Sequence, residues 1–216
     1  MLIKQRLTDQ VYEYLKKRIT DLSLKPGEKI DIRKLADQLK ISPTPVREAI
    51  HKLMEQGLVI SRPYAGYFVI RLSPRDVEEL FDLRKALEFL ALEYVLQNPN
   101  KEFIDKLIEE VEALISIDDT LKLVDGVRSF DEEFHLRFLI EGSGNRWLVK
   151  VANGIIDLVK MTTRLTMNPR AACKEHRDIL KAIKDENGQR ARQLLDAHLE
   201  RSKEEAKRMV ETGMAR

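Results

Sequence analysis

The sequence of 216 residues contains one cysteine, Cys173, and only 6% aromatic residues. A single cysteine excludes an internal disulfide bond and is typical of a reducing compartment. No run of about 18 apolar residues occurs, so we expect no transmembrane helix. Charge interrupts the first residues, MLIKQR, too early for a secretory signal. We therefore expect a soluble, cytoplasmic protein.

The charged residues, 34% of the chain, are unevenly distributed although the net charge is only +2. Residues 1–75 contain 15 Lys/Arg and 8 Asp/Glu, a net charge of +7, whereas the remainder contains 23 and 28, a net charge of −5. A basic first third joined to an acidic remainder indicates that the two parts contact different partners. Chance clustering of surface charge is the alternative at this point.

The first part of the chain has the pattern of a winged helix-turn-helix. Apolar residues at three- and four-residue steps predict three helices, over 7–22, 32–39 and 43–56. Asp31 and Ser42 stand at N-cap positions, and Pro43 occupies the first position of the third helix. Two β-rich runs around a turn-forming stretch predict a hairpin over 58–60 and 67–70. We assign residues 1–72 to this DNA-binding domain.

The predicted third helix carries a polar face suited to DNA. Thr44 and Arg47 lie opposite its apolar face, where a recognition helix has short polar and cationic side chains. Arg47 can reach a phosphate or a guanine edge, while Ser42 and Thr44 can donate to phosphates. Arg33, at the start of the preceding helix, suits a contact to the DNA backbone. The alternative is a helix-turn-helix that contacts another protein.

These segments resemble the head of the GntR family of bacterial repressors. The likeness lies in LADQL at 35–39, ISPTPVREAI at 41–50 and EQGLV at 55–59. The hairpin is similar to that family's wing, whose tip glycine, here Gly66, contacts the minor groove. The resemblance also implies base contact at Pro43, where many relatives carry an arginine. Because proline has no side-chain donor, we expect a different operator sequence.

The remainder of the chain, residues 73–216, is predicted to be an all-α bundle with its own core, so the fold class is mainly α. Ser73 caps the first of its helices. Short breaks rich in Asn, Asp, Gly or Pro separate the helices. The helices are predicted over 74–97, 101–117, 119–141, 145–166, 170–185 and 189–212.

All three histidines of this bundle lie on apolar helical stripes. Asp131 and His135, four residues apart, share one helix face, and His176 and His198 lie on two later helices. Placing a carboxylate and three imidazoles inward is costly unless they satisfy one another or a cation. A divalent ion bound by all four removes that cost and leaves coordination positions open. A hydrogen-bonded polar cluster is the alternative.

The bundle resembles the effector domain of the FadR subfamily, often called FCD. The likeness lies in LRKALE at 83–88, DEEFH at 131–135, EH at 175–176 and HL at 198–199. In many members the Asp and His positions bind zinc, nickel or a similar ion, and all four are present here. The resemblance therefore implies a divalent metal ion, with zinc or nickel as the leading candidates.

Arg84 falls on an inward stripe of the first bundle helix. A guanidinium near a metal suits a small carboxylate whose oxygens bridge the two cations. A structural ion pair with Glu88, four residues along, is the alternative. Cys173, one turn before His176, is expected to belong to the core rather than to add a ligand. The family resemblance implies that the effector is a small organic acid.

These features predict a regulator and not an enzyme, because no general-base motif, nucleophile elbow or phosphate loop accompanies the metal residues. One recognition helix contacts few base pairs, so a homodimer on a palindromic double-stranded DNA operator provides specificity. We expect a small carboxylate beside the metal to change the placement of the two heads and so control repression. A purely structural metal and a metal-dependent enzyme are the alternatives.

Overall fold

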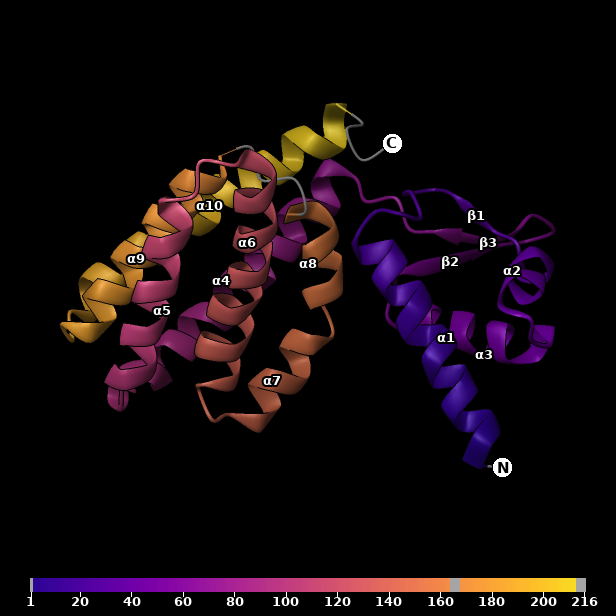
Figure 1. Cartoon of the computed structure of the whole chain (residues 1–216), viewed down its shortest axis with the longest axis horizontal. Helices are drawn as coiled ribbons and strands as arrows, with labels where there is room; N and C mark the ends of the chain where they lie inside the picture. The colour runs from indigo at the N-terminus through magenta and orange to yellow at the C-terminus, as the bar shows by residue number, and fades with distance from the viewer. Residues whose placement is uncertain (1, 164–167, 213–216) are drawn as a thin grey trace.

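The computed structural model describes residues 2–163 and 168–212, and the side chains within them from Leu7 onward. An N-terminal helix-turn-helix with a small sheet stands beside a C-terminal helical bundle (Figure 1). The mainly helical fold class predicted from the sequence is confirmed. None of the helices in the described ranges has the length and apolar character needed to cross a membrane.

The head contains three helices and three short strands. Its helices are α1 (Leu2–Thr20), α2 (Ile32–Leu39) and α3 (Pro43–Glu55). Its antiparallel sheet, ordered β1-β3-β2, contains β1 (Lys29–Ile30), β2 (Val59–Arg62) and β3 (Gly66–Val69). Strand β1 was not predicted, because two residues are too few for an alternating pattern. It extends the predicted hairpin into a three-stranded wing.

The two predicted N-caps of the head differ in what their side chains do. Asp31 accepts hydrogen bonds from the backbone N–H groups of Arg33 and Lys34, as a cap residue does. Ser42 occupies the N-cap position of α3, but its side chain makes no capping hydrogen bond. The hydroxyl group of Ser42 is therefore not engaged in closing the first turn, which begins with Pro43.

Helical segments from α4 onward form the bundle. Residue Ser73 caps α4 in a reciprocal capping box with Asp76, as its position predicted. The segments are α4 (Pro74–Gln97), α5 (Lys101–Ile115), α6 (Thr120–Glu132), η1 (Glu133–Glu141), α7 (Arg146–Asn153), α8 (Ile156–Thr163), α9 (Pro169–Lys184) and α10 (Gly188–Thr212).

Two of the predicted bundle helices differ from the observed ones. The helix predicted over 119–141 changes at Glu133 into the π-helix η1, in which backbone bonds span five residues, as from the N–H of Gly142 to the carbonyl of Arg137. The helix predicted over 145–166 is divided near Gly154 into α7 and α8, and its residues 164–166 lie outside the described residues.

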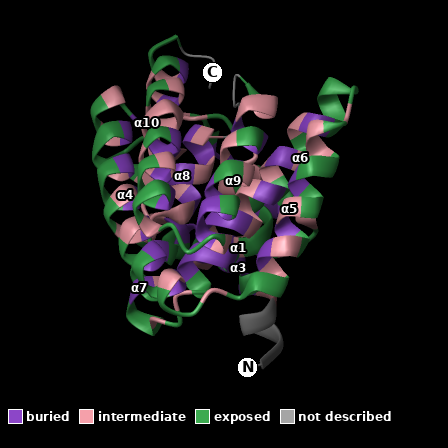
Figure 2. Ribbon diagram, turned by 90° about the vertical axis from the view of Figure 1, so that its left-hand side faces the viewer, coloured by how far each residue is buried: buried purple, intermediate pink, exposed green. Residues whose placement is uncertain are grey.

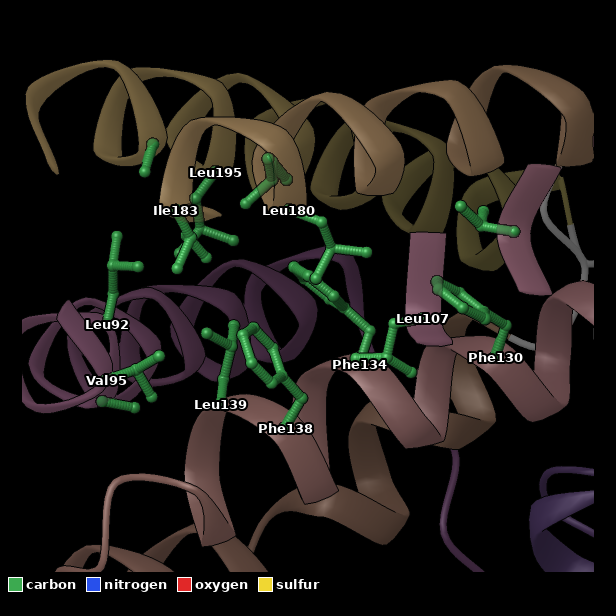
Figure 3. Close-up of a cluster of buried hydrophobic side chains, with 14 of the residues drawn as sticks. Leu92, Val95, Leu107, Phe130, Phe134, Phe138, Leu139, Leu180, Ile183 and Leu195 are labelled. Carbon is green, nitrogen blue, oxygen red and sulfur yellow. The ribbon is translucent and has the colours of Figure 1, made fainter. Parts of the chain in front are cut away.

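The bundle core is continuous across its helices. Buried residues line the inner faces of the helices and exposed residues their outer faces (Figure 2). Each large apolar side chain removed from water contributes about 1.5–3 kcal/mol. Side chains from α4, α5, α6, η1, α9 and α10 meet in this interior: Leu92, Val95, Leu107, Phe130, Phe134, Phe138, Leu139, Leu180, Ile183 and Leu195 (Figure 3).

Helix α8 lies between the head and the rest of the bundle (Figure 1). It packs against α1 of the head and against α4 and α10 of the bundle. Met161 is buried in the core of the head, and Leu158 packs against the same core. Asp157, itself buried, forms an ion pair of 3.1 Å with Lys16 of α1. One short helix therefore belongs physically to both parts.

Candidate metal centre and DNA-binding surface

The structure brings together the four residues that were predicted to bind a metal. Each residue offers one potential ligand atom, and these four atoms all lie within 4.8 Å of one another. The Nε2 atom of His135 lies 3.1 Å from the Nε2 atoms of both His176 and His198. The Oδ1 atom of Asp131 lies 3.6 Å from Nε2 of His135 and 3.5 Å from Nε2 of His176. Four elements, α6, η1, α9 and α10, thus present donors to one point.

The three imidazoles are buried, whereas the Asp131 side chain is 32% exposed. Burial, together with the neighbouring His198 and His135, lowers the pKa of His176 well below its ordinary value. Burial also lowers the pKa of His198, although its hydrogen bond to Glu175 acts in the opposite direction. At neutral pH these two rings are uncharged, which is the form that binds metal.

Two carboxylates contact the Nδ1 atoms of His135 and His198 and fix the orientation of these rings. The Nδ1 atom of His135 lies 2.7 Å from Oε2 of Glu88, and Nδ1 of His198 lies 2.7 Å from Oε2 of Glu175. Burial tends to raise the pKa of Glu88, but His135 and Arg84 outweigh it and lower this pKa to about 2. An ionised carboxylate only accepts hydrogen bonds, so each Nδ1 donates. The Nε2 atom of the uncharged His198 ring then carries a lone pair.

The spacing of the ring nitrogens bears on the two alternatives left open by the sequence. The Nε2 atom of His135 lies 3.1 Å from Nε2 of His198, which is also a hydrogen-bond distance. Around an ion at about 2.1 Å from each nitrogen, neighbouring ligand atoms lie roughly 3.0–3.4 Å apart. The observed spacing fits that geometry. The four residues therefore form a possible metal site, and a hydrogen-bonded polar cluster is the alternative.

Three of the four predicted metal residues line one open cavity, which has a volume of about 90 Å³. They are Asp131, His135 and His198, and Arg84 lines the cavity beside them. Arg84 is only 5% exposed; its Nε donates to Glu88 at 2.6 Å, whereas its Nη1 has no partner among the described residues. The ion pair weighed for Arg84 is therefore present, and one buried donor remains for a ligand.

Cys173 does not join the four residues. It is fully buried in the hydrophobic core of the bundle, and the metal-ligating group found among the described residues excludes it. Burial raises the pKa of its thiol to about 11, so the side chain stays a neutral thiol at physiological pH.

Most of the predicted DNA-contacting residues meet at one groove of the head. Arg33 of α2, Pro43 and Arg47 of α3 and Gly66 of β3 line the groove between the recognition helix and the wing. Ser42 and Thr44 do not line it but are exposed at the start of α3 beside it. The structure therefore brings these side chains to one side of the head.

Tyr64 is a groove residue that sequence reasoning missed. It lines the same groove from the wing tip and is fully exposed. Its backbone is left-handed, with φ of 60°, which is uncommon for a residue other than glycine, asparagine or aspartate. Its aromatic side chain inside a predicted turn was the one available signal. Sequence reasoning also did not assign Glu175, and it assigned Glu88 only as the partner of Arg84.

Comparisons with known proteins agree with this architecture. The model of bacterial regulatory proteins of the gntR family matches residues 7–69, and that of the FCD domain matches residues 79–201. YdhC of Bacillus subtilis (strain 168), an uncharacterised HTH-type transcriptional regulator, is 32% identical and covers 94% of this chain and 92% of its own. The Nta operon transcriptional regulator of Aminobacter aminovorans is 31% identical over 82% of this chain and 83% of its own.

A solved structure of a GntR transcriptional regulator from Rhodococcus sp. RHA1 has the same fold, with a TM-score of 0.76 at 19% identity. The likeness covers 92% of this chain and 96% of that one. The relatives are transcriptional regulators and not enzymes, as the sequence predicted. The FCD match spans more than half of the chain, and the B. subtilis relative exceeds 30% identity over nearly all of it. The chain therefore belongs to the GntR family of HTH-type transcriptional regulators, in the group with a C-terminal FCD domain.

Proposed function

We propose that this protein is a metal-dependent repressor that binds a palindromic DNA operator as a homodimer in the cytoplasm. A small carboxylate, bound beside the metal in the FCD domain, controls the affinity for DNA. One observation carries the proposal: the cavity beside the four metal residues is also lined by α8, the helix that packs on the DNA-binding head. A ligand in this cavity therefore contacts the element that joins the two parts.

The metal residues of this proposal are Asp131, His135, His176 and His198, and the ion is a divalent one, zinc or nickel. Three imidazoles and one carboxylate fill a tetrahedral site, but an ion that accepts five or six donors keeps positions open. When bound, the ion supplies a Lewis-acidic point that attracts an anionic oxygen. Arg84 supplies the second point, because its buried Nη1 donor has no partner among the described residues. A carboxylate has two oxygens, one for each of these contacts.

Helix α8 provides the physical route from the cavity to the head. Ile156, Val159 and Lys160 line the cavity, and Lys160 forms an ion pair of 2.9 Å with Glu132 of α6. Other residues of the same helix, Leu158 and Met161, pack on the core of the head. A ligand that displaces α8 must therefore also displace its contacts with α1. This is the differential contact that allosteric control requires.

In the proposed complex with double-stranded DNA, α3 lies in the major groove and the wing contacts the neighbouring minor groove. Arg47 contacts a base edge or a phosphate, and Arg33 a phosphate. Ser42 and Thr44 donate to phosphates near the start of α3. Pro43 and Gly66 approach the DNA without a side-chain donor. All six positions lie along or beside one groove.

An exposed apolar surface supports the homodimer. Leu83, Leu90 and Tyr94 follow one line of α4 at seven- and four-residue steps, and each is at least 40% exposed. Trp147 and Val151, at least 56% exposed, lie on α7, which packs against α4. A stripe of this kind on a helix pair is typical of an interface with another helix pair. A second copy suits it, because an isologous contact also supplies the second head.

The experiment that tests the proposal begins with elemental analysis of the tag-free protein beside His176→Ala, with His51→Ala as the matched control in the head. We expect about one zinc or nickel ion per chain in the wild type and the control, and none in His176→Ala. An operator is then selected from random duplex DNA. Its affinity is measured for metal-loaded and chelated protein at one fixed salt concentration.

Each outcome has a distinct meaning. Metal in the wild type and a change of DNA affinity on chelation or on addition of small carboxylates support the whole proposal. Metal that changes only the melting temperature, with DNA affinity unaffected by carboxylates, indicates a purely structural ion. Absence of metal after reloading contradicts the metal site and leaves the DNA-binding function of the family.

A further inference from the structure

Two glutamates, the buried Glu88 and the partly exposed Glu175, connect the candidate metal ligands to arginines in the cavity wall. We propose that Glu88 and Glu175 are positioning residues, each of which fixes one histidine toward the metal and links it to one arginine. The proposal rests on the metal site described under the proposed function. It concerns residues that touch neither the ion nor DNA.

The first connection runs along α4 to η1. Glu88 is 3% exposed, and its two oxygens have separate partners. Oε2 accepts from Nδ1 of His135 at 2.7 Å, and Oε1 accepts from Nε of Arg84 at 2.6 Å. Because both oxygens are engaged, the carboxylate cannot rotate without breaking a buried hydrogen bond. Glu88 therefore fixes the ring of His135 and the guanidinium of Arg84 together.

The second connection repeats this pattern between α9 and α10. Oε2 of Glu175 lies 2.7 Å from Nδ1 of His198. Arg201 donates to both oxygens of the same carboxylate, at 2.7 Å each, and lines the cavity as Arg84 does. Each of these two histidines thus ends an Arg–Glu–His chain whose arginine faces the cavity. Second carboxylates of this kind raise the basicity of a ligating imidazole and fix its orientation.

His176 lacks such a connection. Its Nδ1 atom is buried and has no hydrogen-bond partner among the described residues. Its ring packs instead against Phe134 and Phe130, with centroid distances of 4.7 and 5.5 Å. At Nδ1 of the third imidazole, packing therefore takes the place of a carboxylate, whereas Glu88 and Glu175 act on the other two rings. We therefore expect a substitution of Glu88 to affect metal binding through His135, and a substitution of Glu175 to affect it through His198.

The test uses the full-length protein and two isosteric variants, Glu88→Gln and Glu175→Gln, with Glu205→Gln as the matched control. Glu205 also accepts from Arg201, at 2.6 Å, and lines the same cavity. The dissociation constant for Zn²⁺ is measured by competition with a chromogenic chelator. We expect about 10- to 100-fold weaker binding in each of the first two variants and less than about threefold in the control.

A spectroscopic signature separates positioning from a general loss of stability. With Co²⁺ as the probe, the visible absorption bands report the ligand field, so we expect them to shift in Glu88→Gln and Glu175→Gln but not in Glu205→Gln. Because Glu175 is 31% exposed, its variant tests the proposal even where Glu88→Gln does not fold. Folded variants with unchanged Zn²⁺ affinity and Co²⁺ spectra would overturn the proposal.

A double-mutant cycle tests whether Arg201 affects Zn²⁺ binding through Glu175. If Arg201 acts through Glu175, the effect of Arg201→Gln on Zn²⁺ affinity differs by at least about threefold between the wild-type and Glu175→Gln backgrounds. Additive effects would overturn the link to the arginine. A wild-type protein that binds neither Zn²⁺ nor Co²⁺ would instead contradict the metal site itself, and with it this proposal.

Discussion

Replacement of Met161 by alanine tests whether α8 joins the bundle to the DNA-binding head. The Met161 side chain is 4% exposed and lies in the core of the head, although α8 belongs to the bundle. Truncation of a buried methionine to alanine costs about 2–5 kcal/mol. Because the site lies between two parts that can relax toward each other, we expect the lower half of that range, about 2–3 kcal/mol.

The assay combines stability with a local readout. Urea unfolding gives the loss of stability, and hydrogen exchange followed by mass spectrometry gives the protection of α1 with and without Zn²⁺. In the wild type, we expect Zn²⁺ to slow exchange in α1 as well as in the bundle, because ordering of α8 restricts the head. In Met161→Ala, the effect on α1 should disappear, while the effect on the bundle remains.

Met209→Ala is the matched control. Met209 is 3% exposed and lines the cavity from α10, so its loss should destabilise the bundle to a similar degree. It should leave the Zn²⁺-dependent protection of α1 in place. Equal protection of α1 by Zn²⁺ in the wild type and Met161→Ala would refute the reasoning that assigns this coupling to α8.

Three further outcomes follow from other parts of the molecule. If Arg47 contacts a guanine, Arg47→Ala should weaken operator binding by about 1–3 kcal/mol and relax the preference at one base pair. If Arg47 contacts a phosphate, the same change should lower by about 1 the slope of log K against the logarithm of the salt concentration, measured in a salt titration of operator binding. Burial lowers the pKa of Lys16, but the charge of Asp157 and its hydrogen bond outweigh burial and raise this pKa. The stability from this pair is fully present below the ordinary lysine pKa and is lost as pH rises through the raised one. The stability difference between wild type and Asp157→Asn should therefore shrink above about pH 10.4, measured by urea unfolding. Leu90→Glu should convert the dimer to a monomer, as measured by light scattering. The control Leu121→Glu changes a more exposed leucine on α6 and should leave the dimer intact.

The sequence predicted the positions of the metal residues because helical spacing is a local property. Asp131 and His135 share a face through their four-residue step, and His176 and His198 followed from the apolar stripes around them. The structure places all four together. What spacing cannot predict is which residues approach from other helices, as Glu88 approaches His135 from 47 positions away.

The π-helix η1 is the part of the bundle that periodicity could not predict. A pattern based on 3.6 residues per turn predicts the inward side chains up to Phe138. Backbone bonds that span five residues then change the register, so that Leu139 and Ile140 are buried as well. Such bonding is rare and depends on tertiary packing rather than on local preference. The break near Gly154, which creates α8, was missed because the glycine sits within an otherwise apolar periodic run.

The charges around the cavity predict that the metal controls anion binding. The residues that line the cavity include four cationic and three anionic side chains: Arg84, Arg128, Lys160 and Arg201, and Asp131, Glu132 and Glu205. Inclusion of Glu88, Glu175 and Asp125, which contact three of these arginines, gives four cations against six carboxylates, a balance of −2. A divalent ion changes this balance to zero.

A monocarboxylate should therefore bind to the metal-loaded protein and be repelled by the metal-free one. With acetate and lactate as probes, we expect calorimetry and melting curves to detect binding only after Zn²⁺ or Ni²⁺ is loaded. Arg84→Met should weaken that binding while the metal content stays near one ion per chain, because the guanidinium contacts the anion and not the ion. Equal binding of these acids to chelated and loaded protein would contradict the charge argument. It would separate the anion site from the metal, since an arginine that binds carboxylates unaided needs no second cation.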